Sequence, residues 1–435
     1  MVWSKSGRST LSMAEDAGPL IAGLFRTEAG HLTARLVRLL GPGHLDDAEE
    51  IVQSALTKAL HVWPRSGIPD NPSGWLWRVA RNEAVDGLRR RRFTAPVTPE
   101  DLADSLPDHI ADGQNPRFAA ELSNEKLGLM FACCHPVLAV EARVALTLKA
   151  VCGLGTEQIA RAFLLSEATV AQRITRAKAR LADAQVPFAI PAGSELPERL
   201  EAVLGTLYLL FNEGVGSSDG EDLIRADLVS EALHLARQLA DHPVTGRPET
   251  EAMAALTCLT AARLPARQGP DGLPVLLADQ DRDVWHKGLI AAGFRHLKAS
   301  MAGPVETRWH LEAAIAAAHA MAPTWEATDW AHIVILYDRL SRLAPGPVTL
   351  LNRAVAVGER DGPLAGLAAL APLEGDGLIA RYPLFAATKA SMLERLGDRM
   401  GAAEQLRHAL DIADRIGINQ PDRRLLLARL DRLME

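Results

Sequence analysis

The chain has 435 residues, a formal net charge of −7 at pH 7 and a hydrophobic content of 48%. This composition excludes an intrinsically disordered chain, and no apolar run approaches the roughly 20 residues that span a bilayer. The N-terminus lacks the apolar core of a secretory signal, and four cysteines are too few for a disulfide framework, so we expect a cytoplasmic protein. Abundant Ala and Leu with few aromatic residues favour an all-α fold of roughly two to four domains.

Positive charge is concentrated in the front half of the chain. Residues 126–186 hold eight Lys and Arg against four Asp and Glu, and residues 20–92 hold eleven against eight. Residues 187–435 hold 25 against 33. This difference suggests that the front half meets nucleic acid and that the acidic back half does not.

The first periodic segment is HLDDAEEIVQSALTKALHVWP, residues 44–64. Its apolar positions at helical spacing, which predict the buried face, are Val52, Leu56, Ala59 and Val62. Asp46 is a suitable N-cap, and Pro64 is expected to end the helix.

A second helix is expected to begin near Ser73 and to end at the four arginines Arg89, Arg90, Arg91 and Arg92. Cations near a helix C-terminus are favourable by up to about 1 kcal/mol, which would explain one or two of them. Four in a row exceed what a helix end needs. We therefore predict that the cluster contacts phosphates.

Residues 94–124 are acidic and contain four prolines, which predicts a linker. The segment TEQIARAFLLSEATVAQRITRAKARL, residues 156–181, then divides into two short helices with Thr156 and Ser166 as N-caps. Two such helices around a tight turn, the second one basic, form the helix-turn-helix pattern. The positions expected to face inward are Ile159, Ala160, Leu165, Val170 and Ile174.

The back half of the chain consists of apolar helical patterns broken by Gly and Pro. The clearest pair, residues 384–413, approximates a tetratricopeptide (TPR) repeat with small residues where its helices cross. A diverged copy begins at TLLNRAVAV, with Gly358 in the place of Gly397. Since these glycines are 39 residues apart, we expect an irregular helical-repeat domain.

These pieces together resemble a known family. DDAEEIVQSALTKAL followed by WLWRVARNEAVDGLRRRRF resembles region 2 of a bacterial extracytoplasmic-function (ECF) sigma factor, and the helix-turn-helix segment resembles region 4. The remainder resembles the group of ECF sigma factors with a long TPR-like extension, through FACCHPVL, LYLLFNEGVGSS, QDRDVWHKGLI, HLEAAIAAAHA, TDWAHIVILYDRL and LLNRAVAV. Sigma factors usually have Gly in the helix-turn-helix turn, where Leu164 stands here, so we expect a slightly different turn.

The resemblance implies an all-α protein with a flexible N-terminus, region 2, an acidic linker, region 4, a second linker and a TPR-like extension. The expected bounds are 1–18, 19–93, 94–124, 125–187, 188–197 and 198–435. Such a protein binds core RNA polymerase, recognises the minus-ten and minus-thirty-five promoter elements and starts transcription. We expect no catalytic site, cofactor or metal in the chain, and cis regulation by an extension that contacts the sigma regions or the polymerase.

Two alternatives remain open. A helix-turn-helix regulator that does not direct polymerase would footprint duplex DNA alone. A TPR scaffold with vestigial sigma regions would support no promoter-dependent RNA synthesis.

Reading the minus-thirty-five element needs a helix in the major groove, where Arg can bond guanine and Gln can bond adenine. The candidate residues are Ser166, Glu167, Thr169, Gln172, Arg173, Arg176 and Lys178, of which Lys178 lies late and is expected to touch phosphate. The alternative is a helix-turn-helix that packs on protein.

For the minus-ten element, the resemblance implies that the loop 68–74 holds a flipped base. Aromatic rings beside cations suit exposed bases, because each stacked base contributes roughly 1–3 kcal/mol. The candidates are Asn71, Trp75, Trp77, Arg78, Arg81 and Asn82, with the cluster Arg89, Arg90, Arg91 and Arg92. Core packing is the open alternative for both tryptophans.

The outer face of the first helix resembles the surface that grips the polymerase clamp helices. Its candidate residues are Asp47, Glu50, Gln53 and Lys58, and the alternative is an ordinary solvated face.

Three other features suggest chemistry at first sight. Adjacent Cys133 and Cys134 before His135 lack the usual spacing of metal ligands, so we expect buried packing. The Gly-rich FNEGVGSSDG has no catalytic partner, and we expect Asn212 and Glu213 to hold a contact between helices or domains. The tryptophans of the back half, Trp285, Trp309, Trp325 and Trp330, could line a groove, although core packing is favoured.

Overall fold

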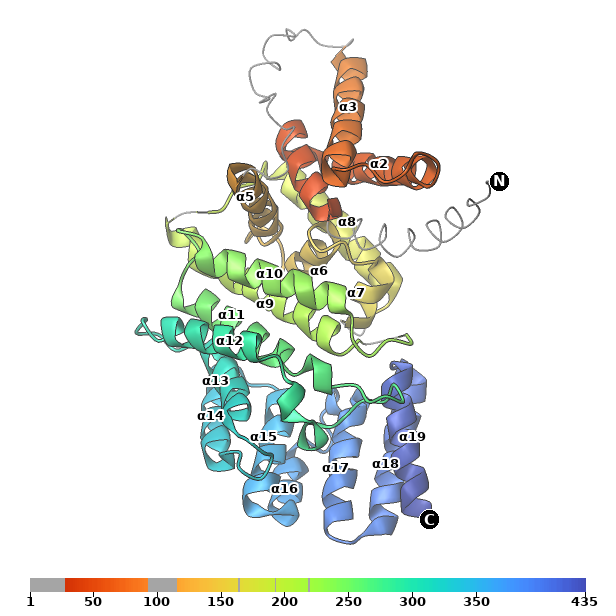
Figure 1. Cartoon of the computed structure of the whole chain (residues 1–435), viewed down its shortest axis with the longest axis vertical. Helices are drawn as coiled ribbons and strands as arrows, with labels where there is room; N and C mark the ends of the chain where they lie inside the picture. Colours follow the sequence, from red (N-terminus) through yellow and green to blue (C-terminus); the bar gives the residue numbers. More distant parts are fainter. Residues whose placement is uncertain (1–27, 93–115, 163–164, 192, 218–219) are drawn as a thin grey trace, which may run out of the picture. The chain divides into compact units, whose positions relative to one another are not determined.

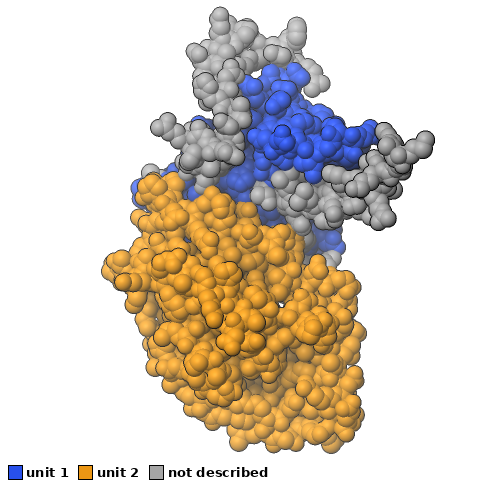
Figure 2. All heavy atoms as spheres, viewed as in Figure 1, with its two compact units in different colours: residues 1–206 blue, residues 207–435 orange. Residues whose placement is uncertain are grey.

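The structure is a computed structural model that describes residues 28–92, 116–162, 165–191, 193–217 and 220–435. Within these ranges the regular structure is helical, apart from one isolated bridge between Gln268 and Pro274, which confirms the all-α prediction. The chain forms two compact units, residues 1–206 and 207–435 (Figure 2). No helix among the described residues is long and apolar enough to cross a membrane.

The first unit contains a helix over residues 28–40, which is followed by further helices and short turns (Figure 1). Its elements are η1 (Pro42–His44), α2 (Leu45–Ser66), α3 (Pro72–Arg92), α5 (Pro116–Cys133), α6 (Val140–Ala150), α7 (Thr156–Ala162), α8 (Glu167–Asp183) and η2 (Gly193–Glu195). Helix α9 (Leu196–Val215) begins in the first unit and ends in the second. Helix α5 begins inside the range 94–124 that was expected to be a linker.

Helix α2 departs from the sequence prediction at both ends. Its N-cap is His44, without a side-chain cap bond, and Asp46 lies in the first turn. Pro64 lies inside the helix, which ends at Gly67 with φ of 83°. A proline in the last turn removes one hydrogen bond only, whereas glycine adopts a positive φ without steric cost, so Gly67 ends the helix.

One expected core position of α2 is also wrong. The buried face consists of Leu45, Ala48, Val52, Ala55, Leu56, Ala59 and Trp63, whereas Val62 is 40% exposed. At 3.6 residues per turn, Trp63 continues the stripe of Val52, Leu56 and Ala59, and Val62 lies to one side of it.

The helix-turn-helix pattern is present as α7 and α8. The Ser166 hydroxyl accepts a hydrogen bond from the Thr169 amide at 3.2 Å, which confirms Ser166 as the N-cap of α8. The expected inward positions Ile159, Ala160, Val170 and Ile174 are buried, and Leu165 is half-buried. Leu164, the departure from the family pattern, lies outside the described residues.

The second unit continues as a succession of helices from α10 to the C-terminus (Figure 1). The helices are α10 (Ala226–Asp241), α11 (Pro248–Ala261), α12 (Lys287–Ser300), α13 (Arg308–Met321), α14 (Trp330–Leu343), α15 (Pro347–Asp361), α16 (Pro363–Leu370), α17 (Pro383–Arg395), α18 (Arg399–Ile416) and α19 (Gln420–Met434). The short 3-10 turns are η3 (Leu264–Ala266), η4 (Leu277–Asp279), η5 (Arg282–Val284), η6 (Ala371–Leu373) and η7 (Ile379–Arg381).

Helices α17 and α18 form the predicted pair, joined at Gly397 with φ of 81°, and their crossing buries small residues such as Ala390 and Ala402. The predicted equivalence of Gly358 and Gly397 is wrong. The turn after α15 is made by Gly362, with φ of 95°, and Gly358 lies within α15. A Cβ at Gly358 would lie 3.5 Å from the Cα of Gly366, so this glycine permits a close crossing of α15 and α16.

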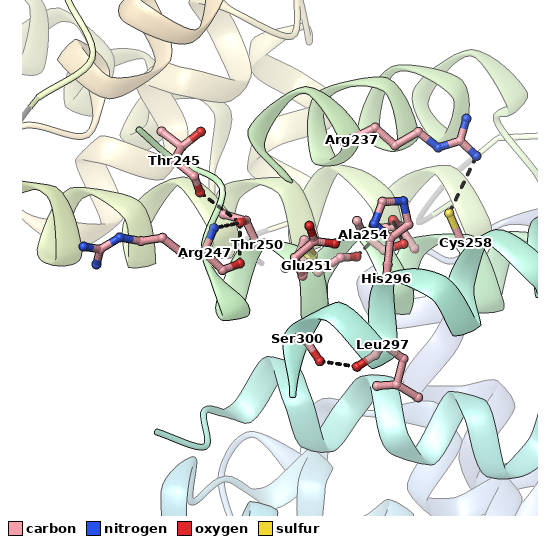
Figure 3. Close-up of polar contacts among 12 residues, drawn as sticks. Arg237, Thr245, Arg247, Thr250, Glu251, Ala254, Cys258, His296, Leu297 and Ser300 are labelled. Carbon is pink, nitrogen blue, oxygen red and sulfur yellow. Dashed lines mark hydrogen bonds and ion pairs between the residues drawn. The ribbon is translucent and has the colours of Figure 1, made fainter. Parts of the chain in front are cut away.

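Polar contacts hold α11 to its neighbours (Figure 3). The Thr250 hydroxyl accepts the Arg247 amide at 2.8 Å and donates to the Thr245 carbonyl at 2.9 Å, which fixes the turn before α11. His296 of α12 lies 2.7 Å from the Glu251 carboxylate of α11. The contact between His296 and Glu251 supplements an apolar contact, in which Gly293 of α12 packs directly on α11.

The Gly-rich segment after α9 joins the two ends of the second unit. The Asn419 amide, at the N-cap of α19, donates to the Ser217 carbonyl at 2.6 Å, and the Gln420 amide donates to the Gly220 carbonyl at 3.0 Å. Glu213 is buried, and its carboxylate accepts from the Ser217 hydroxyl at 3.4 Å. The contacts of this segment with α19 are therefore made by Ser217 and Gly220, and a contact of Asn212 and Glu213 between helices or domains stays a prediction.

Candidate nucleic-acid and polymerase interface

Helix α8 presents a polar face beside a buried one. Its apolar stripe Val170, Ile174, Ala177 and Leu181 packs inward, which turns the other side of the helix to solvent. The exposed side chains on that side are Ser166, Glu167, Thr169, Gln172 and Arg176, and Arg173 is half-buried. The Ser166 and Thr169 hydroxyls lie 2.7 Å apart, so the start of the helix is held in place while its polar face stays open.

Lys178 is placed differently from the other α8 candidates. Its ammonium donates to the Asp46 carboxylate at 2.7 Å and to the Glu49 carboxylate at 2.8 Å, both on α2, and its side chain is only 11% exposed. Burial lowers the pKa of Lys178, but the hydrogen bonds with Asp46 and Glu49 outweigh it and raise the pKa overall. In this arrangement the Lys178 charge is neutralised within the first unit. Its phosphate contact stays a prediction.

Helix α3 carries the minus-ten candidates. Asn71 is exposed and its side-chain oxygen accepts the Gly74 amide at 2.8 Å, so it caps α3. Trp75 is half-buried and lies edge-on to the buried Trp63, with 5.5 Å between ring centroids. Trp77 is 8% exposed, and the Arg35 guanidinium lies 4.1 Å from its ring centroid. Packing therefore accounts for Trp77, whereas part of Trp75 remains accessible; base stacking by either ring stays a prediction.

The cationic face of α3 continues beyond the tryptophans. Arg78 and Asn82 are exposed and Arg81 is half-buried. The backbone of Arg89–Arg92 is the last part of α3, so the cluster ends a helix as predicted, while its side chains lie outside the described residues. Arg and Asn side chains of this kind are common contacts of phosphate and sugar groups in nucleic-acid complexes.

The outer face of α2 is partly engaged in contacts with its own unit. Glu50 and Gln53 are exposed. Asp47 is half-buried, 2.7 Å from the His44 ring, and Lys58 forms an ion pair with Glu83 of α3 at 2.8 Å. Of the four polymerase candidates, Glu50 and Gln53 are therefore the most open for a partner.

Two exposed apolar side chains of α2, Leu60 and Val62, were missed, and Ile68 of the loop 68–74 is exposed as well. Leu60 is 50% exposed, Val62 40% and Ile68 38%, at the end of α2 and in the following loop. Exposed apolar residues at the edge of a polar face are typical of protein interfaces. The signal that could have found them is the helical stripe, since Leu60 and Val62 both fall off the line that leads to Trp63.

The cysteines pack in the interior, as expected. Cys133, Cys134 and Cys152 are buried free thiols, and Cys134 lies 3.5 Å from the Thr147 hydroxyl. Desolvation raises the pKa of the Cys134 thiol to about 11, which disfavours the thiolate that a metal needs. No group of metal-ligating side chains occurs in the part of the chain that the structure describes. Trp285 and Trp309 are likewise buried, and Trp325 packs on Trp330 with centroids 4.5 Å apart.

Comparison with known families matches residues 24–94 to Sigma-70 region 2 and residues 129–181 to Sigma-70, region 4. These ranges contain α2, α3 and α7, and all but the last two residues of α8. The chain belongs to the sigma-70 family. It is an ECF-like sigma factor with a C-terminal extension, and sigma factor families regulate transcription and are not enzymes. Their domains imply core RNA polymerase and promoter DNA as partners.

The extension has relatives of its own. Residues 199–301 match a family of unknown function, DUF6596. Over 390 residues, the chain is 40% identical to an uncharacterized protein of Rhizobium meliloti (strain 1021), and the match covers 90% of each chain. The similarity therefore includes the extension as well as the sigma regions. No solved structure matches the chain.

Proposed function

We propose that this sigma factor uses the exposed face of α8 to read the minus-thirty-five element and α3 with its preceding loop to hold the opened minus-ten element. The observation that carries the proposal is the open polar face of α8, whose start is fixed by the Ser166 cap. A recognition helix contacts base edges with its N-terminal residues, and those of α8 are solvent-exposed.

The side chains of α8 divide by chemistry. Arg176 can bond guanine through two parallel hydrogen bonds, and Gln172 can bond adenine, each contributing about 1–3 kcal/mol of discrimination. Thr169 and Ser166 suit phosphate or sugar contacts near the helix N-terminus. Arg173, which is half-buried, would reach the DNA along the flank of the helix.

In region 2, the exposed Arg78 and Asn82 are supported as contacts to the opened strand. Trp75 is the better candidate for stacking on a base, because Trp77 is buried under Arg35. The arginines Arg89–Arg92 would neutralise phosphates beyond this point. Glu50 and Gln53, with the exposed Leu60 and Val62 further along the same helix, would form the polymerase contact.

The ion pairs of Lys178 with Asp46 and Glu49 support an additional step. They tie α8 to the first turns of α2, so region 4 and region 2 are held together in the free protein. Engagement of a phosphate by Lys178 would require these bonds to break. We infer that promoter or polymerase binding competes with this internal contact.

Run-off transcription with purified core polymerase tests the function, with the full chain and DNA from upstream of its own gene as the first template. We expect a specific transcript that Arg176→Ala reduces strongly. The matched control is Arg415→Ala, which removes the same charge from an exposed position of α18. If the full chain binds no polymerase and supports no transcript, the plain regulator or the scaffold becomes the better interpretation.

Cis regulation by the extension is tested separately by crosslinking. We expect the full chain, incubated with core polymerase, to give crosslinks between residues 207–435 and either the sigma regions or the polymerase. A map without such crosslinks, obtained under conditions in which region 2 does crosslink to polymerase, would argue against this part of the proposal.

A further inference from the structure

Buried nitrogen atoms without a hydrogen-bond partner occur in the second unit, where the η3 and η5 turns contact each other and Arg282 of η5 bonds to the end of α13. The Nε of Arg263, the Nη2 of Arg282, the Nε1 of Trp285 and the Nδ1 of His319 are buried and have no hydrogen-bond partner within the described residues. Buried polar atoms in native proteins are nearly all hydrogen-bonded, so several unsatisfied nitrogens in one neighbourhood require an explanation.

Some of these side chains are fixed by structural bonds. The Nη1 of Arg282 donates to the carbonyls of His319 and Ala322 at 2.6 and 2.7 Å, which holds this guanidinium at the end of α13. Its Cζ lies 4.8 Å from the centroid of the Trp285 ring. The Arg282 guanidinium is therefore held in place through its Nη1 and the Trp285 ring, while its Nη2 has no hydrogen-bond partner within the described residues.

Arg263 has no comparable structural bond. No hydrogen bond or ion pair of its side chain occurs within the described residues, although its Nε is buried. Burial, together with the charges of Arg267 and Arg282, lowers the pKa of Arg263 to about 10. Burial of the His319 ring, together with the charges of Arg263 and Arg282, lowers the pKa of His319 to about 4. The cluster is therefore a positive region inside a unit that is acidic overall.

The opposing charges lie at the edge of the cluster. Arg267 donates through Nε to the Val215 carbonyl at 2.8 Å and is also close enough to Asp422 to feel its charge. Arg282 feels the charge of Glu326, which is exposed. For Arg263 itself, the opposing influence is the phenol of Tyr337, whose own pKa is raised by burial. Among the residues that the structure describes, no carboxylate is a cause of the pKa shift of Arg263.

We propose that Arg263, Arg282, Trp285 and His319 form a binding site for a small oxyanion of the phosphate class. Guanidinium groups match the geometry of phosphate oxygens through paired hydrogen bonds, and the indole and imidazole nitrogens can supply further donors. Such an anion would satisfy nitrogens that the folded chain leaves without acceptors and would offset the mutual repulsion of Arg263 and Arg282. The site lies in the extension and does not depend on the proposed roles of α3 and α8.

The test is titration of the full chain with inorganic phosphate and with pyrophosphate, followed by calorimetry and by thermal unfolding in otherwise phosphate-free buffer. We expect saturable binding at one site and a rise of the unfolding temperature with ligand. Arg263→Gln should weaken phosphate binding about ten- to a hundredfold, the loss expected when one charged partner is removed.

The matched control is Arg339→Gln, which removes an arginine of the same unit whose guanidinium is paired with Glu306. It should keep the phosphate affinity of the parent chain. Non-specific stabilisation by phosphate salts raises the unfolding temperature of all three proteins alike, so only the difference between variants counts.

A second readout separates a ligand site from a structural arginine. In phosphate-free buffer, Arg263→Gln should unfold at the same or a higher temperature than the parent chain, because it removes an uncompensated buried charge. If Arg263→Gln does not fold, Arg263 is structural and the proposal fails. It also fails if phosphate and pyrophosphate do not bind, or if Arg263→Gln binds them as the parent chain does.

Discussion

Arginines occupy opposite environments in the two units of this sigma factor. On α8 of the first unit, Arg176 is exposed, on a helix whose opposite side forms the core. In the second unit, Arg263 and Arg282 have buried nitrogens, and burial together with the charges of Arg267 and Arg282 lowers the pKa of Arg263. Exposed arginines can exchange counterions for a polyanion at little desolvation cost, whereas buried arginines suit one small ligand that replaces their water. The exposure of an arginine therefore indicates which kind of anion it suits: a large polyanion where the side chain is exposed, and a small ligand where it is buried.

The largest expected effect concerns the buried cluster and pH. The pKa of His319 is lowered to about 4 in the folded chain, against a usual value near 6.5. The unfolded chain therefore binds a proton first as pH falls, and stability is lost between about pH 6.5 and pH 4. By this linkage we expect a loss of about 2 kcal/mol from His319 between pH 7.5 and pH 5.

Thermal or urea unfolding of the full chain at both pH values measures this loss. His319→Gln is the comparison variant, because its side chain does not titrate. The difference in unfolding free energy between the two proteins should change by the stated amount between the two pH values. An unchanged difference would mean that His319 is not held in the neutral form by its burial and by the charges of Arg263 and Arg282.

The exposed arginine should show a large effect on DNA and a small one on folding. We expect Arg176→Ala to reduce the promoter affinity of the reconstituted holoenzyme about ten- to a hundredfold, from the loss of 1–3 kcal/mol of base contact. Its unfolding temperature should stay close to that of the parent chain. Filter binding or fluorescence anisotropy at fixed salt measures the affinity.

The buried arginine provides the reciprocal control. Arg263→Gln should leave promoter affinity unchanged, while it alters phosphate binding and stability. If Arg176→Ala and Arg263→Gln reduce promoter affinity equally, the exposure of an arginine does not distinguish the DNA contacts from the buried cluster.

An intermediate effect is expected at the cap of α8. Ser166→Ala removes the acceptor for the Thr169 amide and should destabilise the start of the helix by about 1 kcal/mol. Hydrogen exchange at the amides of α8 would detect this as loss of protection in its first turn. Ser166→Asp preserves an N-cap acceptor and should restore the protection; equal exchange in all three proteins would show that the cap contributes little.

Whether the sequence predicts a feature depends on how far apart in the chain the residues are that determine it. The Ser166 cap and the buried stripe of α8 are local, because one turn of helix determines them, and both follow from the sequence. Gly358 was assigned to a turn because a repeat pattern does not reveal which glycine has a positive φ and which lies at a helix crossing. Val62 was placed inward because a stripe of small and branched residues is ambiguous at its edges.

The tertiary contacts of charged residues could not be predicted in the same way. Lys178 pairs with Asp46 and Glu49 from a helix more than a hundred residues earlier. Arg263 and Arg282 come from separate turns, and His319 comes from α13, with no shared local pattern. Only the fold brings such side chains together, so the sequence gives their charge but not their partners.

The smallest effect is expected at Lys178 of the first unit. It is a candidate DNA contact, yet its side chain is mostly buried and paired with Asp46 and Glu49. The double variant Asp46→Asn with Glu49→Gln removes both acceptors and should release Lys178. Because partly exposed ion pairs contribute only about 0.2–1 kcal/mol each, we expect the association of the chain with core polymerase to become faster by a few-fold.

The double variant Asp411→Asn with Asp414→Asn removes two exposed carboxylates from α18 and is the charge-matched control. Stopped-flow anisotropy at two salt concentrations measures both rates. Faster association in the first variant alone would place Lys178 in an internal contact that must open, whereas equal rates in both would make that contact incidental to polymerase binding.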